Sequence, residues 1–250
     1  MGIAPLTTEP SYGAWKFCAW NGMIFMAVFI VFWGYLGHNL PPYGGDLEAS
    51  VIAAYFRENA NMVRLGMVIS MTFAVSYAVW GIAIGKVMDH VLGRGHLFTD
   101  LQVWGAGLTV CPILVSSSFW LAGAYRPEAL PDETLQLLYD AAWLLIDLGY
   151  SVTSVQMIAL GFGCLLDKRA VPLFPKWVCW YSIWVGIMFT AECLMPFFKS
   201  GPFSRQGILN FWIEFMIFFV YAPIITWYVI KGINRIRREA GDAAGSAAHA

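Results

Sequence analysis

The chain has 250 residues, of which 59% are hydrophobic and only 12% are charged, and its formal net charge is −1. A soluble domain has about 45–50% apolar and about 25% charged residues, and a globule of this length could not bury the apolar excess. The composition therefore excludes a soluble enzyme and a disordered protein, and the charge balance excludes a nucleic-acid-binding protein. It predicts an all-α, polytopic membrane protein.

Six long apolar stretches follow one another along the chain. Crossing a bilayer takes about 20 mostly apolar residues in a helix, and the stretches that meet this requirement are 17–37, 62–87, 101–124, 135–166, 177–198 and 208–230. They are continuous, whereas a membrane β-barrel would show short alternating segments. Residues 47–61 have helical spacing, and we expect a short helix on the outer surface there. The sequence thus predicts one transmembrane domain over residues 1–238, a bundle of about six helices.

The basic residues indicate which way the helices cross. With the N-terminus inside, the 15 lysines and arginines divide unequally between the two sides. The inner segments would hold Lys16, Lys86, Arg94, Lys168, Arg169, Lys176, Lys231, Arg235, Arg237 and Arg238, and the outer segments Arg57, Arg64, Arg126, Lys199 and Arg205. Because basic residues favour the cytoplasmic side, we expect both termini in the cytoplasm, in a cell membrane of the bacterial inner-membrane type. Residues 239–250 are small and polar, which predicts a disordered cytoplasmic tail.

The sequence carries no motif of a known catalytic or cofactor site. It lacks His-Glu-x-x-His, Gly-x-Ser-x-Gly and the phosphate-binding loop. Its 4 histidines are scattered and its 5 cysteines form no Cys-x-x-Cys pair. The sixth stretch has no lysine for a retinal Schiff base. We therefore expect no metal and no cofactor, and we interpret the cysteines as small buried hydrophobic residues.

The main functional signal is a set of four acidic residues within the predicted spans: Asp140, Asp147, Glu192 and Glu214. A charge inside a bilayer costs a few kcal/mol, so such residues usually line a cavity, pair with a cation or stay protonated. At about 1.5 Å of rise per residue, all four fall in the outer half of the membrane, although they come from three different spans. This convergence predicts a pocket that opens outward.

Aromatic residues accompany these acids. Asp140, Trp143, Asp147 and Tyr150 recur every three or four residues, which places them on one helical stripe that should face the bundle interior. Trp212 lies beside the acid of the sixth span. An aromatic side chain in such a position can form the wall of a pocket by stacking or by cation–π contact.

Arg64 and Arg126, which end their spans on the outer side, leave two interpretations open. Asp147 or Glu214 could pair with one of these arginines and simply join two helices. Alternatively, since four acids face two arginines, some acids lack a cation and would bind a proton or a cationic ligand. In that second case the acids, the aromatic residues and the two arginines together line a substrate-binding site.

Three functions are compatible with these patterns. The first is binding or transport of a small hydrophobic or amphipathic solute, coupled to protons through the acids; six spans are few for a transporter, which leaves room for a homo-oligomer. The second is an intramembrane enzyme that acts on a lipid or isoprenoid, with Asp147 and Glu214 as acid and base. The third is a non-catalytic subunit of a membrane complex. Membrane lipids and a small molecule are the expected partners, and nucleic acid is not.

Overall fold

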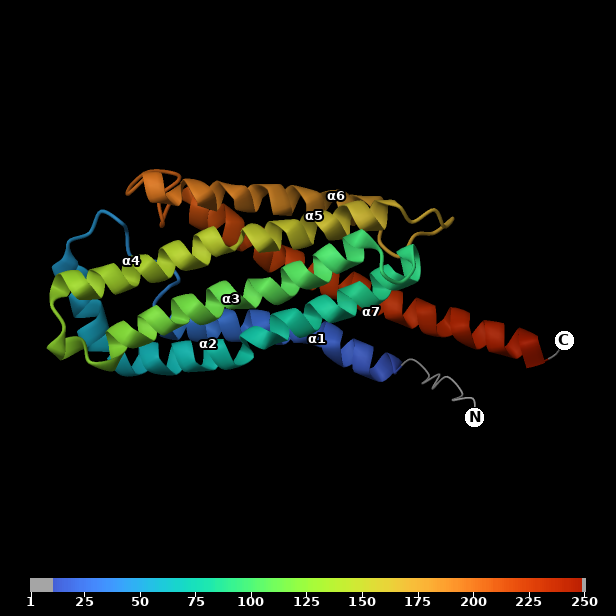
Figure 1. Ribbon diagram of the computed structural model, residues 1–250, viewed down its shortest axis with the longest axis horizontal. Coiled ribbons are helices and arrows are strands. Elements are labelled where there is room, and N and C mark those ends of the chain that lie inside the picture. The colour runs from blue at the N-terminus through green and yellow to red at the C-terminus, as the bar shows by residue number, and fades with distance from the viewer. Residues whose placement is uncertain (1–10, 249–250) are drawn as a thin grey trace, which may run out of the picture.

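A computed structural model of the chain describes residues 11–248, with the side chains of residues 11–243. Every regular element in this part of the chain is a helix. Six helical segments within it are long and apolar enough to cross a membrane, as the sequence predicted. They run side by side along the long axis of the molecule, and this helical bundle is compatible with an integral membrane protein (Figure 1).

The first three spans are built from long helices. They comprise α1 (Tyr12–Val28), which continues as the π-helix η1 (Phe29–Leu36), then α2 (Ala49–Leu92) and α3 (Leu97–Tyr125). The separate surface helix expected over 47–61 is not formed, because α2 runs without a break for 44 residues. No proline interrupts this stretch, and a 2.8 Å ion pair between Arg57 and Asp132 holds the N-terminal part of α2.

Each of the last three spans is divided in two. They comprise α4 (Asp132–Gly149) and α5 (Ser151–Leu165), then α6 (Lys176–Met188) with the 3₁₀-helix η3 (Phe189–Phe197), and finally the π-helix η4 (Ile208–Ile213) with α7 (Glu214–Ala248). A short 3₁₀ turn, η2 (Pro127–Ala129), connects α3 to α4. The α4–α5 break falls at Tyr150, and a side chain on the preceding Gly149 would collide with the ring of Pro112 on α3. Glycine therefore permits the close approach of these two helices at the break.

The end of α7 differs from the expectation for the tail. Composition predicts disorder from residue 239, yet α7 continues to Ala248. Alanine, which is frequent in this segment, has the highest helix propensity. At the start of the segment, Arg235 Nε donates to Glu239 Oε1 over 2.7 Å, which supports the helix beyond the apolar span. Residues 1–10, 249 and 250 lie outside the described residues.

The two ends of the bundle differ in what they carry. The first described helix starts and the last one ends at the same end, as an even number of spans requires (Figure 1). We call this the termini end, and it also holds the connections 93–96 and 166–175. The opposite end, the loop end, holds the connections 37–48, 126–131 and 198–207. That the termini end faces the cytoplasm stays a prediction from the basic residues.

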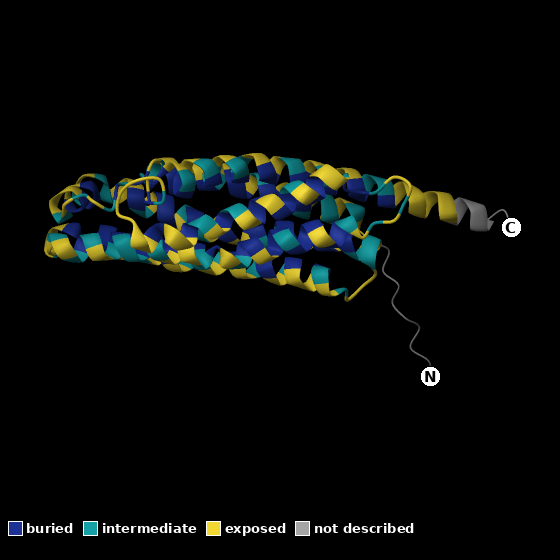
Figure 2. Cartoon of the chain, turned by 90° about the horizontal axis from the view of Figure 1, so that it is seen from above, coloured by how far each residue is buried: buried dark blue, intermediate teal, exposed yellow. Residues whose placement is uncertain are grey.

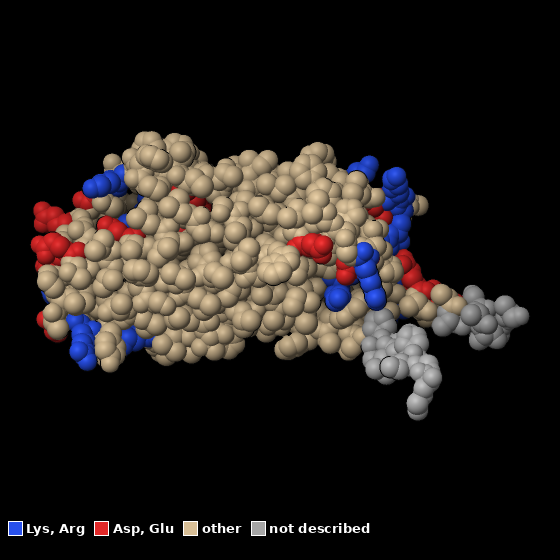
Figure 3. All heavy atoms as spheres, in the orientation of Figure 1, with Lys and Arg blue, Asp and Glu red and all other residues tan. Residues whose placement is uncertain are grey.

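Exposed and charged residues are distributed as a bilayer requires. Exposed and buried residues alternate along the helices (Figure 2), and large apolar side chains such as Phe17, Trp104 and Trp227 are exposed. Lysine, arginine, aspartate and glutamate gather towards the two ends of the bundle (Figure 3). An extensive apolar belt between two charged rims is stable in contact with lipid, whereas in water it would associate with other apolar surface.

Candidate functional site

Three acidic side chains from three spans meet inside the bundle. Asp147 comes from the last turn of α4, Glu192 from η3, and Glu214 from the first residue of α7. Their exposed fractions are 5%, 2% and 0%. The carboxyl groups of Glu192 and Glu214 lie within range of each other's charge, and both are within range of Asp147. We call these three residues the acid cluster.

Irregular helix geometry surrounds the acid cluster. Glu192 lies on the 3₁₀-helix η3, Glu214 directly follows the π-helix η4, and Asp147 precedes the α4–α5 break by three residues. The first span contributes Phe29, the first residue of the π-helix η1, to the same cavity wall. Departures from α-helical geometry expose backbone groups, disturb the regular hydrogen-bond ladder and recur at functional sites. Four of the six spans are irregular where they approach this cluster.

The acid cluster has little polar support from its surroundings. Asn210 Nδ2 donates to Asp147 Oδ2 over 3.2 Å. The carboxyl groups of Glu192 and Glu214 lie within hydrogen-bonding range of each other. Beyond this contact, both carboxyl oxygens of Glu214 and the Oε2 atom of Glu192 are buried without a partner among the described residues. No ion pair in this part of the chain includes any of the three acids.

A small cavity lies beside Glu192 and Glu214. Its volume is ≈ 10 Å³, and its walls are Phe29, Tyr150, Phe189, Phe215 and Phe218 together with the two glutamates. This is room for about one water molecule. Three ionised carboxylates at such close range in an apolar interior would repel one another and lack solvation. The arrangement therefore favours a state in which at least one of the three carboxyl groups is protonated.

An aromatic layer separates the acid cluster from the loop end. Trp33, Trp120 and Trp143 pack edge to face, with ring centroids 5.5–5.9 Å apart, and each is at most 1% exposed. Trp143 lies four residues before Asp147 on α4, which is about 6 Å towards the loop end. These rings lie on the loop-end side of the acids. What the structure shows at the acids themselves is the ≈ 10 Å³ cavity, and the expectation that a pocket opens outward there stays a prediction.

A second polar site lies beyond this layer. The Arg205 guanidinium pairs with Asp140, lies over the ring of Tyr139 at 5.1 Å, and donates to the carbonyl oxygen of Tyr43 over 3.4 Å. Arg205 is 5% exposed, although it comes from the connection 198–207. A charge-assisted contact of this kind fixes the loop over the end of the bundle.

Buried polar side chains continue from the acid cluster towards the termini end. Tyr77 donates to Gln156 over 2.9 Å, and Ser182 and Tyr221 share a hydrogen bond of 2.8 Å. Other members keep polar atoms that are buried without partners: Thr99, Gln102, Ser154, Gln156 and Thr226. We call this set the polar column. In proteins, buried polar groups of this kind commonly bond to ordered water molecules.

The structure brings together only part of the predicted site. Asp147, Tyr150, Glu192 and Glu214 converge, whereas Asp140 lies two turns nearer the loop end and pairs with Arg205. Trp143 belongs to the aromatic layer. Trp212 is 45% exposed, because it lies two residues from Glu214, a spacing that points to a different face of a helix.

The two predicted arginines lie away from the acid cluster. Arg64 Nε donates to the Ala124 carbonyl oxygen over 2.8 Å, so it caps the end of α3. Arg126 is exposed and stacks over Tyr125 at 5.2 Å. The pairing of Asp147 or Glu214 with either arginine is not formed, since both arginines sit at the rim, where backbone carbonyls and water can solvate them.

Sequence reasoning missed two residues that the structure places at these sites. Asn210 interrupts the sixth apolar stretch, and a polar amide there was a detectable signal. Arg205 stands in a loop 65 residues from Asp140 along the chain, so no periodicity could connect them. Comparisons with protein-family models, with characterised proteins and with solved structures found no match.

Proposed function

We propose that this protein is a proton-coupled transporter of a small hydrophobic or amphipathic solute, and that the acid cluster carries the proton. The single observation behind this proposal is that three buried carboxyls from three spans form no ion pair among the described residues, and that two of them, Glu192 and Glu214, line a water-sized cavity. Intramembrane acids in this setting are typical of proton relays. A structural role would instead require that each acid be satisfied by a cation or by donors.

The surroundings of the acid cluster support alternating access. On the loop-end side, the aromatic layer of Trp33, Trp120 and Trp143 would prevent passage to the acid cluster, and Arg205 holds the connection 198–207 over this layer by its ion pair with Asp140. On the termini side, the polar column offers groups that water can bridge. On this proposal, bridging water would carry a proton between the acid cluster and the termini end.

Helix irregularity supports the solute part of the proposal. A cavity of ≈ 10 Å³ admits water but no solute, so spans must move to form a binding site. The segments η1, η3 and η4 and the break at Tyr150 are the places where such movement disrupts the fewest α-helical hydrogen bonds. Once opened, the phenylalanine walls would face an apolar or amphipathic solute.

Proton flux into proteoliposomes tests the proposal. Vesicles that hold a pH-sensitive dye receive the purified protein, and a potassium diffusion potential set with valinomycin drives protons inward. No solute is present, so the flux measured is the uncoupled proton leak of the carrier; we expect this leak in the wild type and expect it to fall to the protein-free level in Glu214→Gln and Asp147→Asn. Glu58→Gln, an exposed acid on α2, is the matched control. Equal flux in the wild type and in both cluster variants would refute a proton-carrying role.

An intramembrane enzyme acting on a lipid or isoprenoid is the second candidate. The observation that favours it is the unequal environment of two neighbouring acids, since Asp147 accepts a hydrogen bond from the Asn210 amide, whereas Glu214 faces the carboxyl group of Glu192. Unequal environments can separate an acid from a base. Lipid extracts from cells that express the wild type or Asp147→Asn would differ in composition if the protein is an enzyme and would be identical under transport alone.

A further inference from the structure

A basic groove opens at the termini end, far from the acid cluster. It lies between the connection 166–175 and α7, and its volume is about 410 Å³. Pro172 and Pro175 form part of one wall. The other wall carries Lys231, Arg235 and Arg238, which are spaced by four and three residues and therefore share one face of α7. We call this feature the basic groove.

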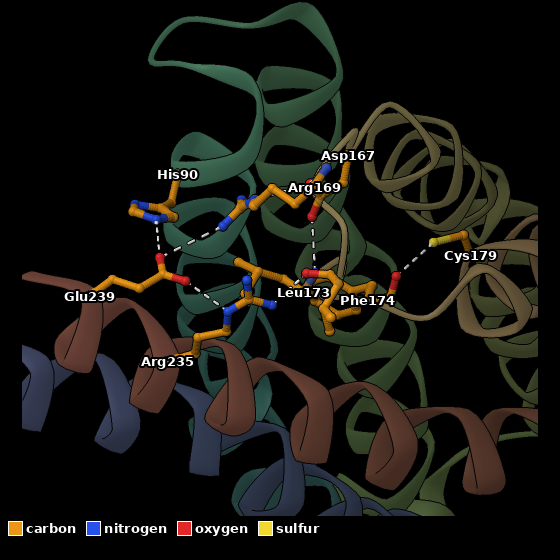
Figure 4. A network of polar contacts seen from close by, with 9 residues as sticks. His90, Asp167, Arg169, Leu173, Phe174, Cys179, Arg235 and Glu239 are labelled. Carbon is orange, nitrogen blue, oxygen red and sulfur yellow. Dashed lines mark hydrogen bonds and ion pairs between the residues drawn. The ribbon is translucent and has the colours of Figure 1, made fainter.

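Hydrogen bonds hold the loop wall of the groove in place. The Asp167 carboxylate accepts from the backbone N–H of Leu173 over 2.9 Å, and from the backbone N–H and Nε of Arg169 over 3.2 and 3.0 Å (Figure 4). Arg235 then connects this wall to α7, since its Nη1 donates to the carbonyl oxygen of Val171. The groove is therefore preorganised rather than formed by a loose loop.

The charges around the groove do not cancel. Glu239 contacts Arg235, Arg169 and His90, so its negative charge is already engaged by neighbouring side chains (Figure 4). Lys231 and Arg238 form no ion pair among the described residues, and both are exposed. The groove thus presents two positive charges without an ion-pair partner, beside an arginine that is held in position, and the nearest further acid on α7, Asp242, follows Arg238 by four residues outside the groove wall.

The level of the groove in the bilayer indicates which kind of anion would bind to these basic residues. Tyr228 precedes Lys231 by three residues on α7, and its ring packs against that of Trp177 with centroids 5.9 Å apart. Paired aromatic residues of this kind lie at the level of lipid headgroups. The Lys231 ammonium lies over the Tyr228 ring at 5.8 Å, between the apolar span and the charged end. The groove therefore faces the headgroup layer of the bilayer.

We propose that the basic groove binds the phosphate of an anionic phospholipid headgroup, with Lys231 and Arg238 as its main ligands and Arg235 as the residue that positions the wall. A soluble phosphate has the same charge, but the apolar contribution of Val171, the two prolines and Tyr228 to the walls suits the glycerol and upper acyl region of a lipid. This inference is independent of the proposed transport function.

Lipid titration by native mass spectrometry tests the site. The protein in a mild detergent is titrated with phosphatidylglycerol, with phosphatidylcholine and with glycerol 3-phosphate, and the dissociation constant of the first bound molecule is measured. We expect preference for phosphatidylglycerol, and a weakening of about 30-fold in K231Q/R238Q, since each basic residue at a membrane surface contributes about fivefold. K231R/R238K keeps both charges and should keep the preference.

The control variant is K168Q/R237Q, which removes two charges at the same end from residues outside the groove walls. Equal affinity of K231Q/R238Q and this control for phosphatidylglycerol would overturn the site. Equal affinity of the wild type for phosphatidylcholine and for phosphatidylglycerol would also overturn it, because the groove would then not distinguish an anionic headgroup from a headgroup without net charge. Binding of glycerol 3-phosphate as tight as that of the lipid would overturn the lipid assignment and give the groove to a soluble phosphate instead.

Discussion

Replacing Glu214 with methionine separates a functional acid from a structural one. Glu214 is 0% exposed, and apart from the neighbouring carboxyl of Glu192 its carboxyl oxygens are buried without partners among the described residues. Methionine has a similar length and no group that requires a strong hydrogen bond. Mutational data give a cost of about 1–3 kcal/mol for burying an unsatisfied polar group. We therefore expect Glu214→Met to raise the free energy of unfolding by about 1–3 kcal/mol while it abolishes proton flux.

The assay is unfolding in SDS followed by circular dichroism, carried out beside the proteoliposome flux measurement on the same preparations. Glu58→Met is the control, since this exposed acid of α2 makes no ion pair among the described residues. A surface substitution of this kind usually changes stability by less than about 0.5 kcal/mol. A gain in stability together with lost flux is the signature of a residue retained for function at the expense of stability.

The result that would refute this reasoning is a loss of stability. If Glu214→Met lowered the free energy of unfolding by more than about 1 kcal/mol, the carboxyl would be making net favourable contacts that join helices. The acid cluster would then be a structural feature of the bundle, and the argument for a proton-carrying site would lose its physical basis.

Two further outcomes follow from the polar column and from the loop wall of the basic groove. Gln156→Leu should leave the Tyr77 hydroxyl buried without its 2.9 Å acceptor, which lowers the free energy of unfolding by about 1–3 kcal/mol, and it should slow proton flux. The control Val155→Leu, at an exposed apolar position on the same helix, should change neither stability nor flux. Unaltered flux in Gln156→Leu would exclude the polar column as a proton route. Burial raises the pKa of Asp167, but hydrogen bonds from Leu173 and Arg169 outweigh it and hold the pKa below its ordinary value of 3.8. Because the folded-state pKa is lowered, this carboxylate stabilises the fold fully above pH 3.8 and loses its effect as the pH falls further. The melting temperature of Asp167→Asn should thus lie below that of the wild type at about pH 6 and approach it near about pH 3; a difference that does not change with pH would contradict this assignment.

The number and type of the spans could be predicted from the sequence because hydropathy is a local property. A continuous apolar run must be a helix if it crosses lipid, whatever its neighbours do, since the bilayer leaves no partner for free backbone groups. The same reasoning placed Asp147, Glu192 and Glu214 at one depth, because depth along a helix follows from counting residues. The helix extensions over 49–61 and 239–248 were missed because exposed polar segments carry no such constraint.

Only the tertiary structure decided which acids meet and which find another partner. Asp140 and Asp147 share a stripe on α4, yet Asp140 pairs with Arg205 from a distant loop while Asp147 joins the two glutamates. Loop placement depends on contacts between segments far apart in sequence, and rotation about each helix axis depends on how all six pack together. The aromatic layer and the ≈ 10 Å³ cavity are likewise products of that packing, because their walls combine side chains from five spans and the volume left between them depends on how all of these spans fit together.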